Sequence, residues 1–326
     1  MLDAAICFFD SSGHYYKQAL ITAASLFSNS SVPVRLHVVV GNAPDSNVQN
    51  RFEALAAETK GEIVWHKAPK VPEDIARRLE SWLGIGALFR LMLPQLVQQK
   101  RLLYLDCDVV CECDAAKTLA YDLEGAFLGV VPFGQKKLPY FVKRLKLDPH
   151  RYFNSGVMLM NLERFRKDMP DLIKRTADII LAHNGKMADQ EALNILFNKW
   201  PGALRLMPEF FNFRIWQENH ACLPLPEYKG KFLHFSGRKP WEQFTHAGIY
   251  YWKYYNRLFP DDDIFATITL LPSYEHAELC TYMLTHKLAR GFVRRLYEFK
   301  EKGVLATVFH RLTQGSGRFS GGTEKR

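Results

Sequence analysis

Two aspartates stand where an apolar segment ends, in the stretch RLLYLDCDVVCECD at residues 101–114. The run at 102–105 is typical of a buried β-strand, and Asp106 and Asp108 follow it directly. Burying an unpaired carboxylate is costly, so two of them at the end of a core strand need a compensating interaction. The two acids therefore need either a binding partner from elsewhere in the sequence or hydrogen bonds to nearby backbone.

Three interpretations of Asp106 and Asp108 imply different chemistry. In the first, the acids only form a turn and cap a helix, because short acidic side chains bond nearby backbone at strand ends. In the second, they are the nucleophile and general acid of a phosphohydrolase of the haloacid-dehalogenase type, although that motif usually lies near the N-terminus. In the third, both hold a divalent cation against a diphosphate and stabilise the charge of a departing nucleotide.

Strands and helices are expected to alternate along the chain. Apolar runs that predict strands lie at 4–9, 34–40, 63–65, 102–105, 127–131, 153–162 and 231–235. Helical patterns lie between them, near 19–26, 46–57, 77–99, 170–184 and 190–200. Strands separated by helices predict parallel pairing and a Rossmann-like layered sheet. Ligands of such sheets bind beyond the carboxyl ends of the strands, where Asp10, Asp106, Asp108 and Gly237 are expected to meet.

The composition is that of a globular α/β protein. The 326 residues allow one large domain with a smaller appendage, or two modest domains. Apolar residues at 48% and charged residues at 24% predict an ordinary hydrophobic core. The sequence has no apolar run of membrane-spanning length, and MLDAAICFFD lacks the basic region of a secretory signal, so we expect a cytoplasmic protein.

Three of the six cysteines cluster beside the two acids, at Cys107, Cys111 and Cys113. Their C-x3-C-x-C spacing matches no common zinc site, and no C-x-x-C pair exists. If the strand continued through them, alternation would point all three away from the acids. A reduced, structural role is therefore favoured over a zinc site.

Four stretches, in this order, resemble one enzyme family. They are YLDCDVV (104–110), YFNSGVMLMNLERFR (152–166), ADQEALNILF (188–197) and LHFSGRKPW (233–241). Together they are similar to retaining glycosyltransferase family 8, which includes glycogenin and the bacterial lipopolysaccharide glucosyl- and galactosyltransferases, over about residues 4–260. Residues 271–296 resemble the C-terminal extension of the lipopolysaccharide-core members.

The resemblance implies a GT-A fold, a Rossmann-like nucleotide-sugar-binding domain with a mixed, mainly parallel sheet, plus a small helical C-terminal extension. We expect the catalytic domain at 1–262, the basic helical extension at 263–312 and a disordered tail at 313–326, where the sequence is rich in Gly and Ser with a basic end. The implied activity is transfer of glucose or galactose from a UDP-sugar, with retention, to a lipopolysaccharide-core or related glycolipid or oligosaccharide acceptor.

The same resemblance assigns a metal site. Asp106 and Asp108 would bind Mn2+ or Mg2+, and His234 would be the third protein ligand; a buried core histidine is the alternative for His234. Gly237 would let the backbone approach the diphosphate, and Lys239 would neutralise its charge. This loop is one residue shorter than in some members of the family.

Further residues match positions around the transferred sugar. Arg90 matches the helix arginine that contacts the donor near its phosphates, with a solvated helix arginine as the alternative. Asn154 and Asp189 match residues that hydrogen-bond the sugar, although Asp189 could also cap its helix. Gln190 matches the side chain next to the anomeric carbon. An amide is a poor nucleophile, which favours a front-face route, but the sequence does not distinguish it from double displacement.

The nucleotide would be held by the first loop. Asp10 is expected to contact the uracil or ribose, and Tyr15 to serve as the stacking platform. Residues 11–14 depart from the family pattern by an insertion of one or two residues. Cys107 lies between the two metal-binding acids, and we expect it to contribute to donor binding.

The positive charge of the chain is concentrated at its end. Ten Lys or Arg and three Glu lie at 286–326, giving this segment +7 of the net +9. Apolar residues recur there at helical spacing, at Leu288, Phe292, Leu296 and Phe299. Such a basic amphipathic helix could dock on an anionic membrane, or pack on the catalytic domain with a solvated face. No nucleic-acid-binding module accompanies the charge, so no nucleic-acid partner is expected.

Two other classes of function remain alternatives. A phosphohydrolase would need no nucleotide and would lose activity on loss of Asp106 alone. A non-catalytic protein would bind a UDP-sugar and turn nothing over.

Overall fold

The structure of the protein is a computed structural model. It describes residues 1–10, 13, 15–42, 45–70, 73, 85–134, 140–183, 188–215, 223, 225–237, 239–241 and 247–262. The chain divides into two compact units, Met1–Ile215 with Pro226–Gly237, and Trp216–Leu225 with Arg238–Arg326. The helical extension expected at 263–312 and the tail expected at 313–326 lie outside the described residues. The domain boundaries at 262 and 312 therefore stay predictions.

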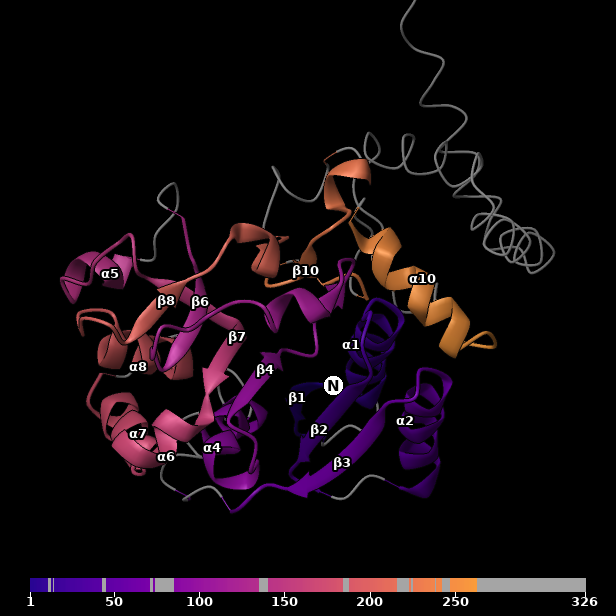
Figure 1. Ribbon diagram of the computed structural model, residues 1–326, viewed down its shortest axis with the longest axis horizontal. Coiled ribbons are helices and arrows are strands. Elements are labelled where there is room, and N and C mark those ends of the chain that lie inside the picture. The colour runs from indigo at the N-terminus through magenta and orange to yellow at the C-terminus, as the bar shows by residue number, and fades with distance from the viewer. Residues whose placement is uncertain are drawn as a thin grey trace, which may run out of the picture. The chain divides into compact units, whose positions relative to one another are not determined.

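The first unit is built on a seven-stranded sheet with the strand order β3-β2-β1-β4-β7-β6-β8 (Figure 1). Its strands are β1 (Leu2–Phe8), β2 (Val34–Val40), β3 (Glu62–Lys67), β4 (Arg101–Leu105), β6 (Leu128–Pro132), β7 (Phe153–Asn161) and β8 (Leu204–Leu206). β7 pairs antiparallel with β4 and β6, whereas the other pairings are parallel. The expected mixed, mainly parallel sheet is confirmed.

The central strands are largely apolar, as expected for strands that are covered on both faces. β1 and β2 pair in register from Leu2 and Val34 to Phe8 and Val40, and nearly every residue in both is buried. One face carries a core cluster that joins β1, β4 and β7 to the helices packed on it. The candidate site begins where β4 ends, beside the first residues of the antiparallel β7.

The helices of the first unit follow the predicted alternation. In the described residues they are α1 (Tyr16–Ser28), α2 (Ser46–Glu58), the 3-10 helix η1 (Ile85–Met92), α4 (Leu93–Leu96), the 3-10 helix η2 (Ala115–Thr118), α5 (Tyr140–Arg144), α6 (Leu162–Asp168), α7 (Leu172–His183), α8 (Ala188–Phe197) and the 3-10 helix η3 (Glu209–Asn212). A further 3-10 helix, η4 (Leu225–Tyr228), spans the border between the two units.

Two of these helices show how local residues set their form. The N-cap of α2 is Asp45, whose side chain accepts the N–H of Val48 at 2.8 Å. The stretch expected to be mostly helical at 77–99 is, in its described part, the 3-10 helix η1 followed by the short α4. Gly86 lies so close to β1 that a Cβ would be 2.9 Å from the backbone nitrogen of Phe9, and Pro94 removes an N–H.

A second, three-stranded sheet lies beside the first in this unit, in the order β5-β10-β9. Its strands are β5 (Val109–Cys111), β9 (Phe213–Arg214) and β10 (Phe232–His234). The strand expected at 231–235 therefore exists, but it pairs here and not in the large sheet. β10 runs antiparallel to β5 with His234 opposite Val109, and parallel to β9 with His234 opposite Arg214.

The described part of the second unit is dominated by the aromatic helix α10 (Gly248–Leu258). The Tyr251 ring packs against Trp241, Trp252 and Tyr255, with ring centroids 5.1–6.0 Å apart. Within the described residues, no helix combines the length and apolar character that crossing a bilayer requires.

Candidate active site

Asp106 is placed by the pairing of β4 with β7. Leu105 lies opposite Val157, and the next residue, Asp106, donates its backbone N–H to the carbonyl of Gly156 at 2.7 Å. Because position 156 has no side chain, the Asp106 carboxylate has room on that side. The Tyr104 hydroxyl donates to Oδ1 of Asp106 at 2.5 Å.

Asp108 and His234 meet because the chain turns after Asp106. The N–H of Val109 donates to the Asp106 carbonyl at 3.2 Å, and β5 begins at Val109, directly opposite His234. The N–H of Phe235 then donates to the Asp108 carbonyl at 2.9 Å. Side-chain alternation is therefore not what brings the two acids together; a turn between two strands does so.

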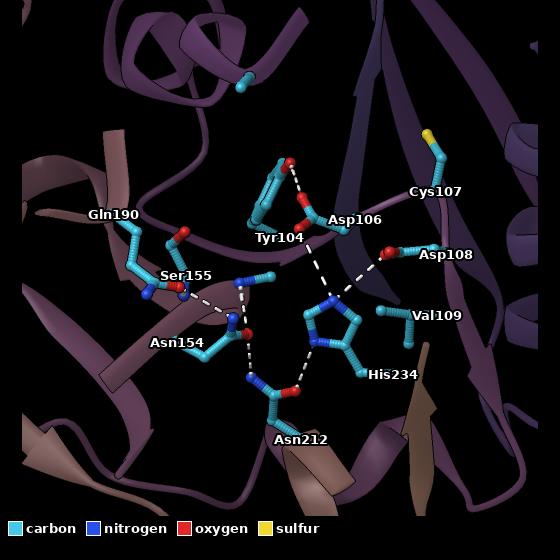
Figure 2. A network of polar contacts seen from close by, with 12 residues as sticks. Tyr104, Asp106, Cys107, Asp108, Val109, Asn154, Ser155, Gln190, Asn212 and His234 are labelled. Carbon is cyan, nitrogen blue, oxygen red and sulfur yellow. Dashed lines mark hydrogen bonds and ion pairs between the residues drawn. The ribbon is translucent and has the colours of Figure 1, made fainter. Parts of the chain in front are cut away.

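The three side chains form a compact cluster of cation-binding groups (Figure 2). One ligand atom from each of Asp106, Asp108 and His234 lies within 4.8 Å of the others. Nε2 of His234 is 3.2 Å from Oδ1 of Asp108 and 3.9 Å from Oδ2 of Asp106. The imidazole is 2% exposed.

This cluster fits a hard divalent cation. Carboxylate oxygens are the ligands that Mg2+ and Mn2+ prefer, and the His234 imidazole adds one neutral nitrogen ligand. Gly156 leaves the necessary space, since a Cβ there would lie 2.2 Å from Cε1 of His234 and 2.7 Å from Oδ2 of Asp106. The alternative of a plain core histidine does not explain why two carboxylates face the ring.

Arg90, on η1, joins the metal-site acids to the next group of residues. Its guanidinium pairs with Oδ1 of Asp106 at 2.9 Å and with Oδ2 of Asp189 at 3.2 Å. It also donates to the carbonyl of Ser155 at 2.9 Å and lies over the Tyr104 ring at 4.7 Å. Arg90 is 6% exposed, so the alternative of a solvated helix arginine is wrong.

Burial and charge act in opposite directions on this ion-pair group. Burial lowers the pKa of Arg90, but the charges of Asp106 and Asp189 outweigh it and hold that pKa well above its usual value. Burial raises the pKa of Asp189, and the positive charge of Arg90 opposes that rise. The arginine therefore holds two acids together that would otherwise repel each other.

Asn154, Gln190 and Tyr152 form a hydrogen-bonded row beside the arginine. Nδ2 of Asn154 and the N–H of Ser155 both donate to Oε1 of Gln190, at 2.9 and 3.2 Å. Nε2 of Gln190 donates to the Tyr152 hydroxyl at 2.9 Å. The amide that interrupts the apolar strand at position 154 thus has the partners that a buried polar group requires.

One residue completes the link between this row and the metal-site cluster. Nδ2 of Asn212 donates to Oδ1 of Asn154 at 3.0 Å, and Oδ1 of Asn212 lies 2.8 Å from Nδ1 of His234. Figure 2 shows Asn212 between the imidazole and Asn154. A continuous polar network therefore connects the candidate metal ligands with Gln190.

A sequence model of Glycosyl transferase family 8 matches residues 6–245. The chain belongs to this family.

Similar proteins agree with this membership. The chain is 30% identical to the lipopolysaccharide 1,2-glucosyltransferase of Escherichia coli K12 over 181 residues, which is 51% of this chain and 52% of that protein. It is 27% identical to glycosyltransferase GlyB of Streptococcus pneumoniae serotype 4 over 192 residues, which is 54% of this chain and 43% of that protein. The chain thus spans about half the length of these relatives.

Solved structures of low sequence identity share the fold. The galactosyltransferase LgtC, solved with donor and acceptor sugar analogues, superposes with a TM-score of 0.63 at 20% identity, covering 81% of this chain and 99% of LgtC. Glycosyltransferase GlyE of Streptococcus pneumoniae gives a TM-score of 0.60 at 20% identity, covering 78% of this chain and 60% of GlyE. The GT-A fold expected from the sequence is confirmed.

The first loop of this family 8 member is described only in part. The Asp10 carboxylate accepts the N–H of Tyr16 at 2.9 Å and thereby caps the start of α1. Tyr15 is 40% exposed, and partial burial, together with the negative charge of Asp108, raises its pKa well above the usual value. Nucleotide binding by Asp10 and Tyr15 stays a prediction.

Three further donor-binding candidates are Cys107, Gly237 and Lys239. The Cys107 thiol points away from the His234 ring and donates to the carbonyl of Cys7 at 3.5 Å (Figure 2). The four described cysteines are free and buried, as a structural role predicts. Gly237 ends the described segment after β10, whereas Lys239 belongs to the second unit, with its ammonium 5.9 Å from the Trp241 ring. Donor binding by Cys107, Gly237 and Lys239 stays a prediction.

The sequence reasoning missed several residues of the network, namely Tyr104, Tyr152, Ser155, Gly156 and Asn212. A usable signal existed for Asn212, which stands among aromatic residues in EFFNF at 209–213. An amide in such an apolar setting must find a polar partner. Gly156 carried a similar signal, because a glycine inside an apolar strand indicates the close approach of another group.

Proposed function

We propose that this glycosyltransferase is a metal-dependent, retaining hexosyltransferase that takes glucose or galactose from a UDP-sugar. The acceptor would be a lipopolysaccharide-core or related glycolipid or saccharide. The observation that carries the proposal is the convergence of Asp106, Asp108 and His234 within 4.8 Å, next to a polar network that includes Gln190. Lipopolysaccharide 1,2-glucosyltransferase among the relatives supports the acceptor class.

Asp106, Asp108 and His234 would hold the cation, Mn2+ or Mg2+. When bound, it would supply positive charge against the diphosphate oxygens that gain negative charge as the nucleotide leaves. Arg90 would keep the Asp106 carboxylate in place, because the guanidinium is itself anchored to Asp189 and to the Ser155 carbonyl.

Asn154 and Asp189 would hydrogen-bond the transferred sugar, and Gln190 would lie next to its anomeric carbon. The Gln190 amide oxygen already accepts two N–H groups, and its nitrogen donates to Tyr152. A held, neutral amide is a poor nucleophile. We therefore favour a front-face route, in which the acceptor hydroxyl enters on the side the nucleotide leaves and gives its proton to the departing phosphate.

The first loop and the segment after β10 would hold the rest of the donor. We place Asp10 against the uracil or ribose, Tyr15 against the base, and Gly237 and Lys239 at the diphosphate. Cys107 lies between the two acids, so its backbone would be close to the same phosphate oxygens.

The direct assay mixes the protein with Mn2+ and either UDP-glucose or UDP-galactose and follows UDP release. We expect release with one of the two donors, and loss of about 100-fold in rate for Asp108→Asn, because a cation contributes several kcal/mol to such a step. Donor binding should also raise the melting temperature by mass action. The UDP-sugar that raises it more is the preferred donor. No release with any UDP-hexose, with or without a saccharide acceptor, would contradict the proposal.

The non-catalytic alternative is tested with the same variant. If the protein only binds UDP-sugars, Asp108→Asn will weaken binding, but the wild-type protein will release no UDP. Substantial turnover of a phosphomonoester without nucleotide would instead favour a phosphohydrolase.

The membrane is the proposed location of the acceptor. The segment at 286–326 holds +7 of the net charge and would bring the protein to an anionic inner membrane surface as a peripheral protein. Co-sedimentation with vesicles that contain anionic lipid, and loss of binding in high salt, would support this; equal binding to neutral vesicles would contradict it.

A further inference from the structure

The orientation of the two asparagine side chains in the network is forced by the backbone. The N–H of Gly156 is a fixed donor, and it contacts one end of the Asn154 amide at 3.0 Å, so that end must be the oxygen. The atom of Asn212 that lies 3.0 Å from this oxygen must then be its NH2 group. The other end of Asn212 is therefore its carbonyl oxygen.

This assignment fixes the tautomer of His234. The Asn212 oxygen lies 2.8 Å from Nδ1 of His234, and two acceptors would not approach so closely, so Nδ1 carries a hydrogen. In the neutral ring, the lone pair is then on Nε2, the atom that faces Asp106 and Asp108. An imidazole whose other nitrogen donates to a fixed acceptor is the usual arrangement of a metal-ligating histidine.

A second backbone donor fixes the other end of the row. The N–H of Ser155 contacts the Gln190 amide at 3.2 Å, so the atom it meets is the oxygen. Nδ2 of Asn154 donates to the same oxygen, which agrees with the orientation deduced from Gly156. All the bonds from His234 through Asn212 and Asn154 to Gln190 therefore have one consistent set of donors and acceptors.

Asn212 is a buried link between His234 and Asn154 in this row. It is 2% exposed, lies in the last turn of η3 directly before β9, and contacts a metal-site residue with one end and a sugar-site residue with the other. Bulk water therefore does not compete for either contact.

We propose that Asn212 is a positioning residue that holds His234 with its Nε2 lone pair toward the cation and, through Asn154, orients the Gln190 amide. This inference rests on the proposed function, because it assumes that His234 binds a cation. The two ends of the Asn212 amide therefore have different roles, which substitutions can separate. The carbonyl oxygen serves metal binding, and the NH2 group serves the sugar side of the site.

The test compares Asn212→Ala with Asn212→Asp. The aspartate keeps an oxygen for Nδ1 of His234 but presents a second oxygen to Oδ1 of Asn154, which breaks the link to Gln190. Mn2+ affinity is measured without nucleotide, from the electron paramagnetic resonance signal of free Mn2+, and turnover is measured as UDP release. We expect about 10- to 100-fold weaker Mn2+ binding for Asn212→Ala, but a change of no more than about threefold for Asn212→Asp.

Turnover at saturating Mn2+ should fall in both variants by about tenfold or more, with little change in KM for the donor. A residue that only supported the fold would not separate affinity from turnover in this way. Wild-type Mn2+ affinity in Asn212→Ala, or equal loss of affinity in both variants, would overturn the inference. If Asn212→Ala does not fold, Asn212→Asp alone tests the inference. This variant must keep the wild-type Mn2+ affinity within about threefold and release UDP more slowly.

Failure of the metal-dependent function and failure of the role of Asn212 give different results. If the wild-type protein binds no Mn2+, the metal-dependent function fails and the role of Asn212 fails with it. If the wild-type protein binds Mn2+ and releases UDP while Asn212→Ala matches it in both, only the role of Asn212 is wrong.

Discussion

The His234 ring lies against the backbone of Gly156 so closely that a Cβ on Gly156 would be 2.2 Å from Cε1 and 2.8 Å from Nε2. The glycine thus creates the space in which the imidazole reaches the two acids. Any side chain at position 156 would have to displace His234, or Asp106, whose Oδ2 would lie 2.7 Å from the same Cβ.

Replacing Gly156 by Ala should therefore damage the metal site more than the fold. Overpacking of this kind costs about 1–3 kcal/mol, so we expect Mn2+ binding to weaken about 10- to 100-fold as the ring is displaced. Titration with Mn2+ in the absence of nucleotide measures this directly.

Gly129→Ala on β6 is the matched control. Its Cβ would meet the side chains of Met207 and Leu123 at 2.8 and 2.9 Å, away from the acids. We expect a similar loss of stability, about 1–3 kcal/mol, with wild-type Mn2+ affinity. If both variants lost Mn2+ equally, the packing of Gly156 against His234 would have no special role.

Arg90→Met should destabilise the protein strongly, because it leaves Asp106 and Asp189 facing each other without a cation. Removing one partner from a buried ion pair costs about 3–5 kcal/mol. Urea denaturation measures the loss, and a second substitution, Asp189→Asn, should recover part of it by removing one of the two charges. Arg175→Met, which breaks an exposed pair with Asp171, should leave stability nearly unchanged. Equal effects of Arg90→Met and Arg175→Met would contradict the bridging role of Arg90.

Stability should fall on acidification because of a buried histidine on β2. Burial, together with the charges of His66 and Arg35, lowers the pKa of His37 to about 4. In the unfolded chain His37 has an ordinary pKa of about 6.5, so the unfolded state binds more protons than the folded state between pH 6.5 and 4. The free energy of unfolding therefore falls by about 3 kcal/mol as the pH falls through that window.

The variant His37→Gln should flatten this dependence, as measured by urea denaturation at pH 7, 5.5 and 4. The matched control, His150→Gln, removes an exposed ring and should keep the wild-type slope. A steep slope that persists in His37→Gln would show that another group causes the acid sensitivity.

The Tyr152→Phe variant tests whether the Gln190 amide must be held. Tyr152 is fully buried, and its hydroxyl accepts the N–H of Gln190 at 2.9 Å. Losing this bond frees one end of the amide at a cost of about 1 kcal/mol, so we expect kcat to fall about fivefold or more with little change in Mn2+ affinity or donor KM. Unchanged kcat would mean that the orientation of Gln190 is not important for the transfer.

Most of the large sheet could be predicted from the sequence because six of its seven strands overlap the predicted apolar runs. The run at 34–40 has the bounds of β2. No run was predicted for β8, which has three residues. In the small sheet only β10 was expected, from the run at 231–235, since β5 has three residues and β9 has two. Periodicity is not measurable over so few residues.

The candidate site was predicted only as far as the family resemblance reached. Asp106, Asp108 and His234 were named from motifs, and the structure supplies the reason they meet, which is the pairing of His234 with Val109. Asn212 belongs to none of the quoted motifs. It depends on a contact between η3 and β10 that no local pattern encodes.

The anomalous scattering of manganese provides the most direct test of the central claim. A crystal grown with Mn2+ and UDP would be measured at the manganese absorption edge, and the anomalous difference map would be calculated. We predict one strong peak bounded by the carboxylates of Asp106 and Asp108 and by Nε2 of His234, next to the UDP phosphates. UDP bound with no peak at these three side chains, or with the peak at another site, would contradict the account.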